Sequence, residues 1–215
     1  MKKKLAKNKS ATKKYFTIGV VVAVILLIVG AKSYIDSTRG DPHTNVLAKV
    51  KGNPQARLQI VEFIDFQCPP CATGAKYLKR IMDDHPDLIR LELKHFPSPS
   101  HKHAYQSARY SECAARQGSV WPFAELLIQR QQQWEGLADA TDVFGLMAVE
   151  LDLNKKDLDA CLQGENPQDA IEANRREGQA LGVTSTPTYF INGKMVVGPQ
   201  SLEAELNPYL ERKRN

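Results

Sequence analysis

The sequence predicts an α/β domain in which a helical block separates a β-α-β unit from a β-β-α unit, preceded by one N-terminal transmembrane helix. Three observations support this prediction. The tetrapeptide Cys68-Pro69-Pro70-Cys71 stands between a strand-like run and a helical run. The middle of the chain contains no convincing strand for about 85 residues. Near the N-terminus, 17 consecutive residues carry no charge.

The N-terminal residues predict a membrane anchor. Residues 1–14 contain seven lysines and no acid, and residues 15–31 are uncharged. An uncharged run of this length is long for a signal peptide and just sufficient to span a bilayer. The lysines keep residues 1–14 in the cytoplasm as a basic tail and export everything after residue 31, as in a single-pass protein of the inner membrane. A cleaved signal peptide ending at Val29-Gly30-Ala31 remains an alternative.

The net charge of +5 does not indicate nucleic-acid binding. Residues 1–40 hold nine of the 29 basic residues and one of the 24 acidic residues, so the remainder carries 20 basic and 23 acidic side chains. The basic excess is therefore a signal of membrane topology. Residues 32–47 are polar, without periodicity, and are expected to form a tether.

The exported domain, residues 48–215, begins with a predicted β-α-β unit. Residues 58–66 are almost continuously apolar with one acid among them, which is typical of a buried central strand. Residues 72–85 have a helical pattern that ends before Pro86, and residues 88–96 alternate in the manner of a second strand. Residues 48–51 are expected to form a short edge strand.

A helical insertion is predicted over residues 97–182. It follows the helix-breaking segment 97–100 and contains five helical patterns, with asparagines near two of the helix starts. The five helices are expected at residues 103–117, 121–133, 141–151, 154–162 and 167–181.

The chain returns to strands after this insertion. Residues 187–191 and 194–197 flank Asn192-Gly193, a dipeptide that favours the two-residue turn of a β-hairpin. A last helix is predicted over residues 201–212.

The C-x-x-C motif indicates thiol–disulfide chemistry, because two cysteines three residues apart at a helix start can close and reopen a small disulfide ring. Zinc, copper and structural bridges use the same spacing. The chain has four cysteines, and all follow the uncharged run, in a compartment where disulfides persist. They are Cys68, Cys71, Cys113 and Cys161.

The order of elements resembles the thioredoxin fold (β-α-β … β-β-α) with an inserted helical domain, and in particular the membrane-anchored branch of the DsbA family of thiol:disulfide oxidoreductases. The resemblance covers roughly residues 48–212. Four stretches of sequence carry it: residues 63–71 around the cysteines, Phe96-Pro97, residues 101–104 and residues 182–193.

The resemblance implies roles for the cysteines and the residues around them. Cys68 is the expected exposed nucleophile and Cys71 the buried resolving cysteine. Pro187 corresponds to a cis-proline that packs against this pair and turns the Thr186 backbone towards an extended substrate. Glu62 corresponds to a buried acid that takes the proton of the resolving cysteine, and Lys94 is a candidate partner for it.

Further expectations concern the remaining cysteines and Pro70. Relatives of this branch carry a second bridge, so we expect a structural disulfide between Cys113 and Cys161; two buried free thiols are the alternative. The strongly oxidising relatives have a histidine where this chain has Pro70. We therefore expect a Cys68 thiolate that is less stabilised, and a milder oxidant.

These observations predict an exported thiol:disulfide oxidoreductase that forms disulfide bonds in secreted or cell-envelope proteins. Its expected partners are exported thiol-containing substrates and a membrane quinone reductase of the DsbB or VKOR type, and we expect a monomer. No cofactor is expected, and no metal site either, because the histidines lack ligand spacing. The glutamine run, residues 131–133, is expected to form a helix face exposed to solvent. The alternatives are an envelope reductase or isomerase, and a metal-binding or chaperone-like binding protein.

Overall fold

The computed structural model describes residues 18–22, 24–30 and 49–211. The chain separates into two compact units, Met1–Pro42 and His43–Asn215. In the first unit, residues 18–22 and 24–30 are helical. None of the helices in the described ranges is long and apolar enough to cross a membrane. The basic tail (1–14), the tether (32–47) and parts of the predicted span (15–31) lie outside the described residues.

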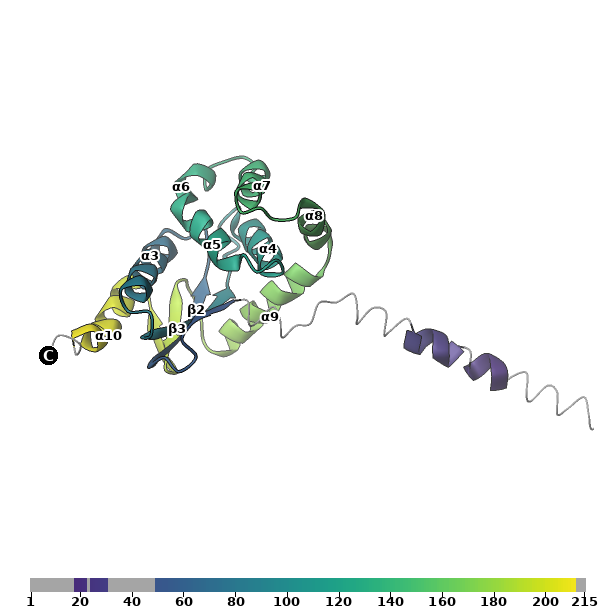
Figure 1. The fold of residues 1–215 in the computed structure, drawn as a ribbon, viewed down its shortest axis with the longest axis horizontal. Helices are drawn as coiled ribbons and strands as arrows, with labels where there is room; N and C mark the ends of the chain where they lie inside the picture. Colours follow the sequence, from purple (N-terminus) through teal and green to yellow (C-terminus); the bar gives the residue numbers. More distant parts are fainter. Residues whose placement is uncertain (1–17, 23, 31–48, 212–215) are drawn as a thin grey trace, which may run out of the picture. The chain divides into compact units, whose positions relative to one another are not determined.

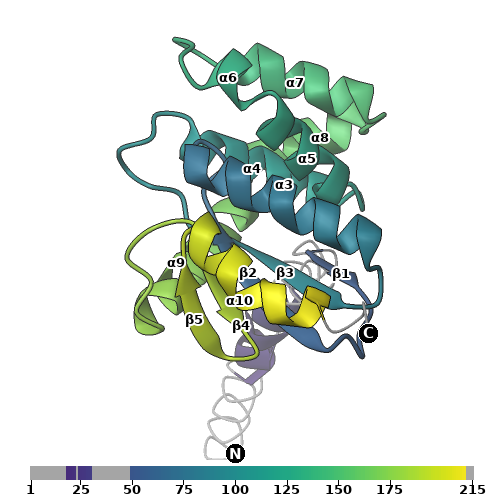
Figure 2. The same ribbon diagram turned by 90° about the vertical axis from the view of Figure 1, so that its left-hand side faces the viewer.

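The second unit is built on a five-stranded sheet with the order β1-β3-β2-β4-β5. Parallel pairing joins the two central strands, β2 and β3, and all other neighbours are antiparallel. This arrangement is shown in Figures 1 and 2. The strands are β1 (Val50–Gly52), β2 (Leu58–Ile64), β3 (Ile89–His95), β4 (Thr188–Ile191) and β5 (Lys194–Val197).

Helices cover both faces of the sheet. α3 (Pro69–Asp84) and α10 (Pro199–Glu211) pack on one face, where side chains such as Leu58, Ile60 and Leu78 form a buried apolar cluster. α9 (Asn166–Ala180) packs on the other face. It approaches closely at Gly178, where an added Cβ would lie 2.9 Å from the Phe63 ring. The alternation of side chains along β2 therefore directs even-numbered residues towards α3 and odd-numbered residues towards α9.

The helices between β3 and β4 enclose a second apolar cluster, which also includes Cys68 and Cys71. Its large buried side chains include Phe123, Trp134 and Phe144. Trp134 and Phe144 meet edge to face, with 5.2 Å between ring centroids. The helices are α4 (Ala104–Ala115), α5 (Val120–Gln129), α6 (Gln131–Trp134), α7 (Thr141–Glu150), α8 (Lys155–Gln163) and α9.

The predicted order of elements is confirmed, with three local differences. The helix that begins with the C-x-x-C motif starts at Pro69, three residues before the predicted start. The single helix predicted over residues 121–133 is divided at Arg130 into α5 and α6. Glu165, and not Asn166, precedes the first helical residue of α9.

Candidate active site

Cys68 lies at the start of α3, immediately after the loop that leaves the carboxyl end of β2. It is the N-cap residue, and Pro69 and Pro70 form the exposed first turn. Proline suits this turn because it has no N–H to leave without a partner. The Cys68 backbone N–H donates to the Asp65 carbonyl at 3.1 Å, and its carbonyl accepts from the Cys71 N–H at 3.0 Å. The two thiols are unbridged in this structure.

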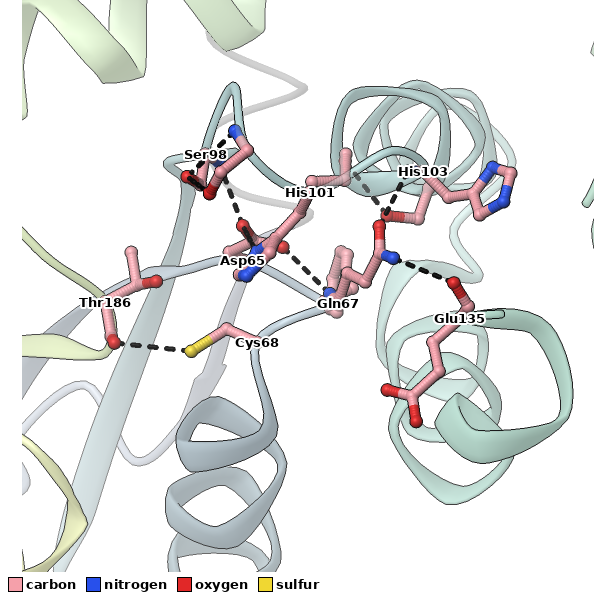
Figure 3. Close-up of polar contacts among 12 residues, drawn as sticks. Asp65, Gln67, Cys68, Ser98, His101, His103, Glu135 and Thr186 are labelled. Atoms are coloured by element: carbon pink, nitrogen blue, oxygen red, sulfur yellow. Dashed lines mark hydrogen bonds and ion pairs between the residues drawn. The ribbon is translucent and has the colours of Figure 1, made fainter. Parts of the chain in front are cut away.

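The loop before β4 lies against Cys68. The Thr186-Pro187 peptide bond is cis, and the Cys68 Sγ lies 3.3 Å from the Thr186 carbonyl oxygen (Figure 3). This contact joins residues 118 positions apart in the sequence. The expectation of an exposed Cys68 is wrong, because only 6% of the residue is accessible to solvent with this loop in place.

The two thiols differ strongly in acidity. The neighbouring Cys71 thiol, acting against the effect of burial, lowers the pKa of Cys68 to about 6. A backbone hydrogen bond from Cys71 and the positive end of the helix dipole act in the same direction. Burial, followed by the proximity of Cys68, raises the pKa of Cys71 well above its ordinary value. The arrangement therefore provides one thiolate near neutral pH and one thiol that retains its proton.

Glu62 points from β2 towards α3 and is 2% exposed. Burial raises the pKa of its carboxyl group to about 7, although the positive charge of Lys51 acts in the opposite direction. Its Oε1 has no hydrogen-bond partner. Glu62 lines a cavity of about 80 Å³, which is large enough to hold water. Lys51 from β1 lines the same cavity, and its Nζ lies 4.3 Å from the centre of the Trp121 ring.

Lys94 is not the partner of Glu62. Its Nζ lies 2.5 Å from Glu177 Oε1 and 3.3 Å from Glu92 Oε1. The strand register explains the difference, because Leu93 is opposite Glu62, and the next residue points to the other face of the sheet. Finding Lys51 from the sequence requires the register of three strands, and no local pattern provides it.

Polar side chains of the helical insertion hold the loop that precedes α3, and the sequence did not predict this contact. Gln131 is 5% exposed, which contradicts the expectation that this residue faces solvent. Its amide donates to the Phe66 carbonyl at 2.7 Å and to the Cys68 carbonyl at 3.2 Å. Gln67 donates to the Glu135 carbonyl and accepts from the His103 N–H, at 3.0 Å and 2.6 Å (Figure 3).

Asp65 and His101 form a second contact that the sequence did not predict. The Asp65 carboxylate is buried, and its Oδ2 lies 2.7 Å from Nδ1 of His101. The two residues are 36 positions apart and come from different loops. His101 belongs to one of the sequence stretches that resemble the DsbA family, but nothing in that stretch indicates its partner.

The other two cysteines are bridged. Cys113 on α4 and Cys161 on α8 form a disulfide with a Cα–Cα distance of 5.7 Å. The bond joins two helices of the insertion and closes a loop of 48 residues. Within the described part of the chain, no group of three or more His, Cys, Asp or Glu side chains is placed to hold a metal ion.

Comparison with known proteins agrees with this geometry. A family model described as thioredoxin (Thioredoxin_4) matches residues 44–211. The chain belongs to this thioredoxin family. The match includes the sheet, the helical insertion and both cysteine pairs, so the predicted thioredoxin-like fold with a helical insertion is confirmed for residues 44–211.

Curated relatives of this thioredoxin-family chain include two proteins named Na(+)/H(+) antiporter NhaA 1. The one from Mycobacterium sp. (strain KMS) is 28% identical over 152 residues, and the one from Mycolicibacterium gilvum (strain PYR-GCK) is 30% identical over 152 residues. Each alignment covers 70% of this chain and 24% of the relative. The chain thus spans about a quarter of the length of these relatives.

Several solved structures resemble this chain, and each match covers most of the solved chain. DsbA2 of Pseudomonas aeruginosa is 28% identical, with a TM-score of 0.55, covering 69% of this chain and 84% of that one. A thioredoxin-like oxidoreductase from Silicibacter pomeroyi DSS-3 is 24% identical, with a TM-score of 0.63 and coverages of 83% and 96%. Oxidised BdbD of Bacillus subtilis is 21% identical, with a TM-score of 0.64 and coverages of 76% and 92%. The predicted kinship with DsbA-like thiol-disulfide oxidoreductases is confirmed.

Proposed function

We propose that this chain is an exported, membrane-tethered thiol:disulfide oxidoreductase that forms disulfide bonds in secreted or cell-envelope proteins. The observation that carries the proposal is the placement of two adjacent thiols at a helix start, one in contact with the Thr186 carbonyl and the other fully buried. Cys68 has a lowered pKa and contacts the Thr186 loop, whereas Cys71 is fully buried and has a raised pKa. A disulfide between them would be attacked at Cys68, because Cys71 has no surface accessible to solvent.

The proposed reaction transfers a disulfide from the protein to its substrate. A substrate thiolate attacks Cys68 Sγ, the Cys68–Cys71 bond breaks, and Cys71 leaves with the electron pair. The second thiolate of the substrate then attacks the substrate sulfur of this mixed disulfide, and Cys68 leaves as a thiolate. The substrate loses two electrons and two protons, and the protein gains a dithiol. The lowered pKa of Cys68 supports the second step, because a more acidic thiol is a better leaving group.

Glu62 is the proposed proton carrier for Cys71. The buried thiolate formed in the first step is unfavourable in an apolar environment and must take up a proton. A carboxyl group with a pKa of about 7 can donate and recover a proton near neutral pH. Water in the cavity that Glu62 shares with Lys51 would let the carboxyl group exchange its proton.

The cellular setting belongs to the same proposal. Residues 1–14 would be a cytoplasmic tail, residues 15–31 an anchor in the inner membrane, and residues 32–47 a tether to the extracytoplasmic domain. The lysine-rich start and the uncharged run support this orientation. A membrane quinone reductase of the DsbB or VKOR type would accept the two electrons and restore the Cys68–Cys71 disulfide, and the domain would act as a monomer.

The test is the redox state of the pair in cells, trapped by alkylation of free thiols in the full chain. An oxidase keeps the pair mostly oxidised, whereas a mostly reduced pair would assign the chain to the reductase or isomerase class. A Cys68→Ser variant that still supports disulfide formation would overturn the enzymatic proposal in favour of a binding protein. A Cys113→Ser/Cys161→Ser double variant is the control, since it retains the pair and loses the other bridge.

A further inference from the structure

A buried carboxylate lies in the loop that leads to Cys68. The Asp65 side chain is fully buried, and three groups donate to it. Gln67 N–H donates to Oδ1 at 2.8 Å, Ser98 N–H donates to Oδ2 at 2.9 Å, and His101 Nδ1 lies 2.7 Å from Oδ2 (Figure 3). A buried carboxylate needs such partners, because an unpaired one would be very costly.

This carboxylate is an unfavourable neighbour for the Cys68 thiolate. The Asp65 backbone carbonyl accepts from the Cys68 N–H at 3.1 Å, so the two residues belong to one tight turn. The negative charge of Asp65 raises the pKa of Cys68, against the larger lowering effect of the Cys71 thiol. Whatever offsets the charge of Asp65 therefore stabilises the Cys68 thiolate.

His101 is the donor in this set that can carry a positive charge. The other two donors are backbone N–H groups, which are neutral. A carboxylate can only accept hydrogen bonds, so Nδ1 of His101 carries the hydrogen in this contact. The His101 side chain remains 31% exposed, whereas the Asp65 side chain is fully buried. The helix itself supplies no imidazole, because Pro69 and Pro70 occupy the positions between the cysteines.

We propose that His101 is a positioning residue for the redox pair: it holds the Asp65 carboxylate, offsets its charge beside the Cys68 thiolate, and so makes the pair more oxidising. This inference rests on the proposed function of Cys68 and Cys71. The relevant equilibrium converts protein dithiol and oxidised glutathione into protein disulfide and two reduced glutathione molecules. Stabilising the Cys68 thiolate favours the dithiol side of this reaction.

The experiment measures this equilibrium constant with the glutathione couple for the full chain and its variants. His101→Ala is expected to shift the equilibrium towards the protein disulfide by about threefold to tenfold, because the Asp65 charge then keeps only its two backbone N–H partners. The matched control is Lys102→Ala, which removes an exposed cation from the same loop. The Lys102 side chain donates to the Leu137 carbonyl and does not contact Asp65. The control is expected to leave the equilibrium unchanged.

A double-mutant cycle separates the effect of charge from the effect of structure. Asp65→Asn alone is expected to shift the equilibrium towards the dithiol, and adding His101→Ala in that background should have no further effect on it. The rate of Cys68 alkylation should follow the same pattern, which gives a second readout if a variant is destabilised. An unchanged equilibrium in His101→Ala, or an equal shift in both backgrounds, would overturn the inference. A pair that does not exchange with glutathione in any variant would overturn the proposed function instead.

Discussion

Two pairs of cysteines lie in one apolar cluster of this molecule, and their surroundings differ. Cys68 and Cys71 are three residues apart on one helix and are unbridged. Cys113 and Cys161 are 48 residues apart on two helices and are bridged. The first pair lies at a helix start beside a carbonyl and a buried acid, whereas the second pair joins helices in the interior of the insertion.

The comparison teaches that burial alone does not distinguish the two cysteine pairs. Both members of the first pair are at most 6% exposed, as are Cys113 and many apolar core residues. The distinguishing features of Cys68 are the helix start, the adjacent thiol and the Thr186 carbonyl at 3.3 Å. These features stabilise a thiolate, whereas the Cys113–Cys161 bond restricts the unfolded chain.

The largest expected difference between the pairs is in activity. Cys68→Ser should lower the rate of dithiol oxidation by about a thousandfold or more, because the remaining Cys71 thiol is fully buried and cannot form the mixed disulfide. Cys113→Ser/Cys161→Ser should retain most of that rate. The rate of oxidation of a dithiol peptide measures both effects. Comparable losses in the two variants would show that the second pair also participates in the chemistry.

For stability, the Cys113–Cys161 pair is expected to matter more than the Cys68–Cys71 pair. Loss of the Cys113–Cys161 bond should lower the free energy of unfolding by about 2–4 kcal/mol, because a long loop in the unfolded chain is no longer closed. Urea denaturation of the oxidised proteins measures this change. Cys68→Ser and Cys71→Ser, each with the second bridge intact, are the comparison, and a larger loss in either of them would contradict the assignment.

Glu62→Gln should change the dependence of stability on pH. Between pH 4.5 and about pH 7, the folded chain retains a proton on Glu62 that the unfolded chain releases, so the free energy of unfolding falls as the pH rises. The variant lacks this decrease and should be more stable than the wild type by about 3 kcal/mol above pH 7. Denaturation of the form with a Cys68–Cys71 disulfide, measured between pH 4.5 and about pH 7, tests this prediction, because a disulfide-bonded Cys68 does not titrate. Parallel curves for the two proteins would show that the carboxyl group ionises normally.

A smaller effect is expected for the contact between the insertion and the active-site loop. Gln131→Ala removes the donor to the Phe66 and Cys68 carbonyls and should cost about 1–2 kcal/mol of stability. Gln132→Ala, at the exposed neighbouring position, is the control and should change stability by less than about 0.5 kcal/mol. Equal effects of the two variants would show that this contact does not contribute to the stability of the fold.

Local patterns predicted the elements of the fold because the alternation of strands, the periodicity of helices and the Asn192-Gly193 turn are properties of short stretches. The hairpin, the buried strand β2 and the helix after Cys68 are examples. The resemblance to a known family added the cis peptide at Pro187 and the bridge between Cys113 and Cys161. The expected roles of Cys68, Cys71, Thr186, Pro187 and Glu62 in catalysis remain predictions.

Contacts between distant segments could not be predicted in the same way. Lys51 reaches the cavity of Glu62 only through the register of β1, β3 and β2, and Lys94 points to the other face of the sheet. The sequence predicts a solvent-facing glutamine run, because a run of polar residues does not reveal that Gln131 meets the carbonyls of Phe66 and Cys68. His101 shows no spacing relative to Asp65 that would indicate their contact.

The central claim is that one cysteine pair exchanges and the other does not. The most direct test is a glutathione redox titration of the full chain in which the state of all four cysteines is read by differential alkylation and mass spectrometry. The account predicts that Cys68 and Cys71 pass together from dithiol to disulfide within the range of the glutathione couple, while Cys113 and Cys161 stay bridged throughout. A titration in which all four cysteines change together, or in which only Cys113 and Cys161 respond, would contradict it.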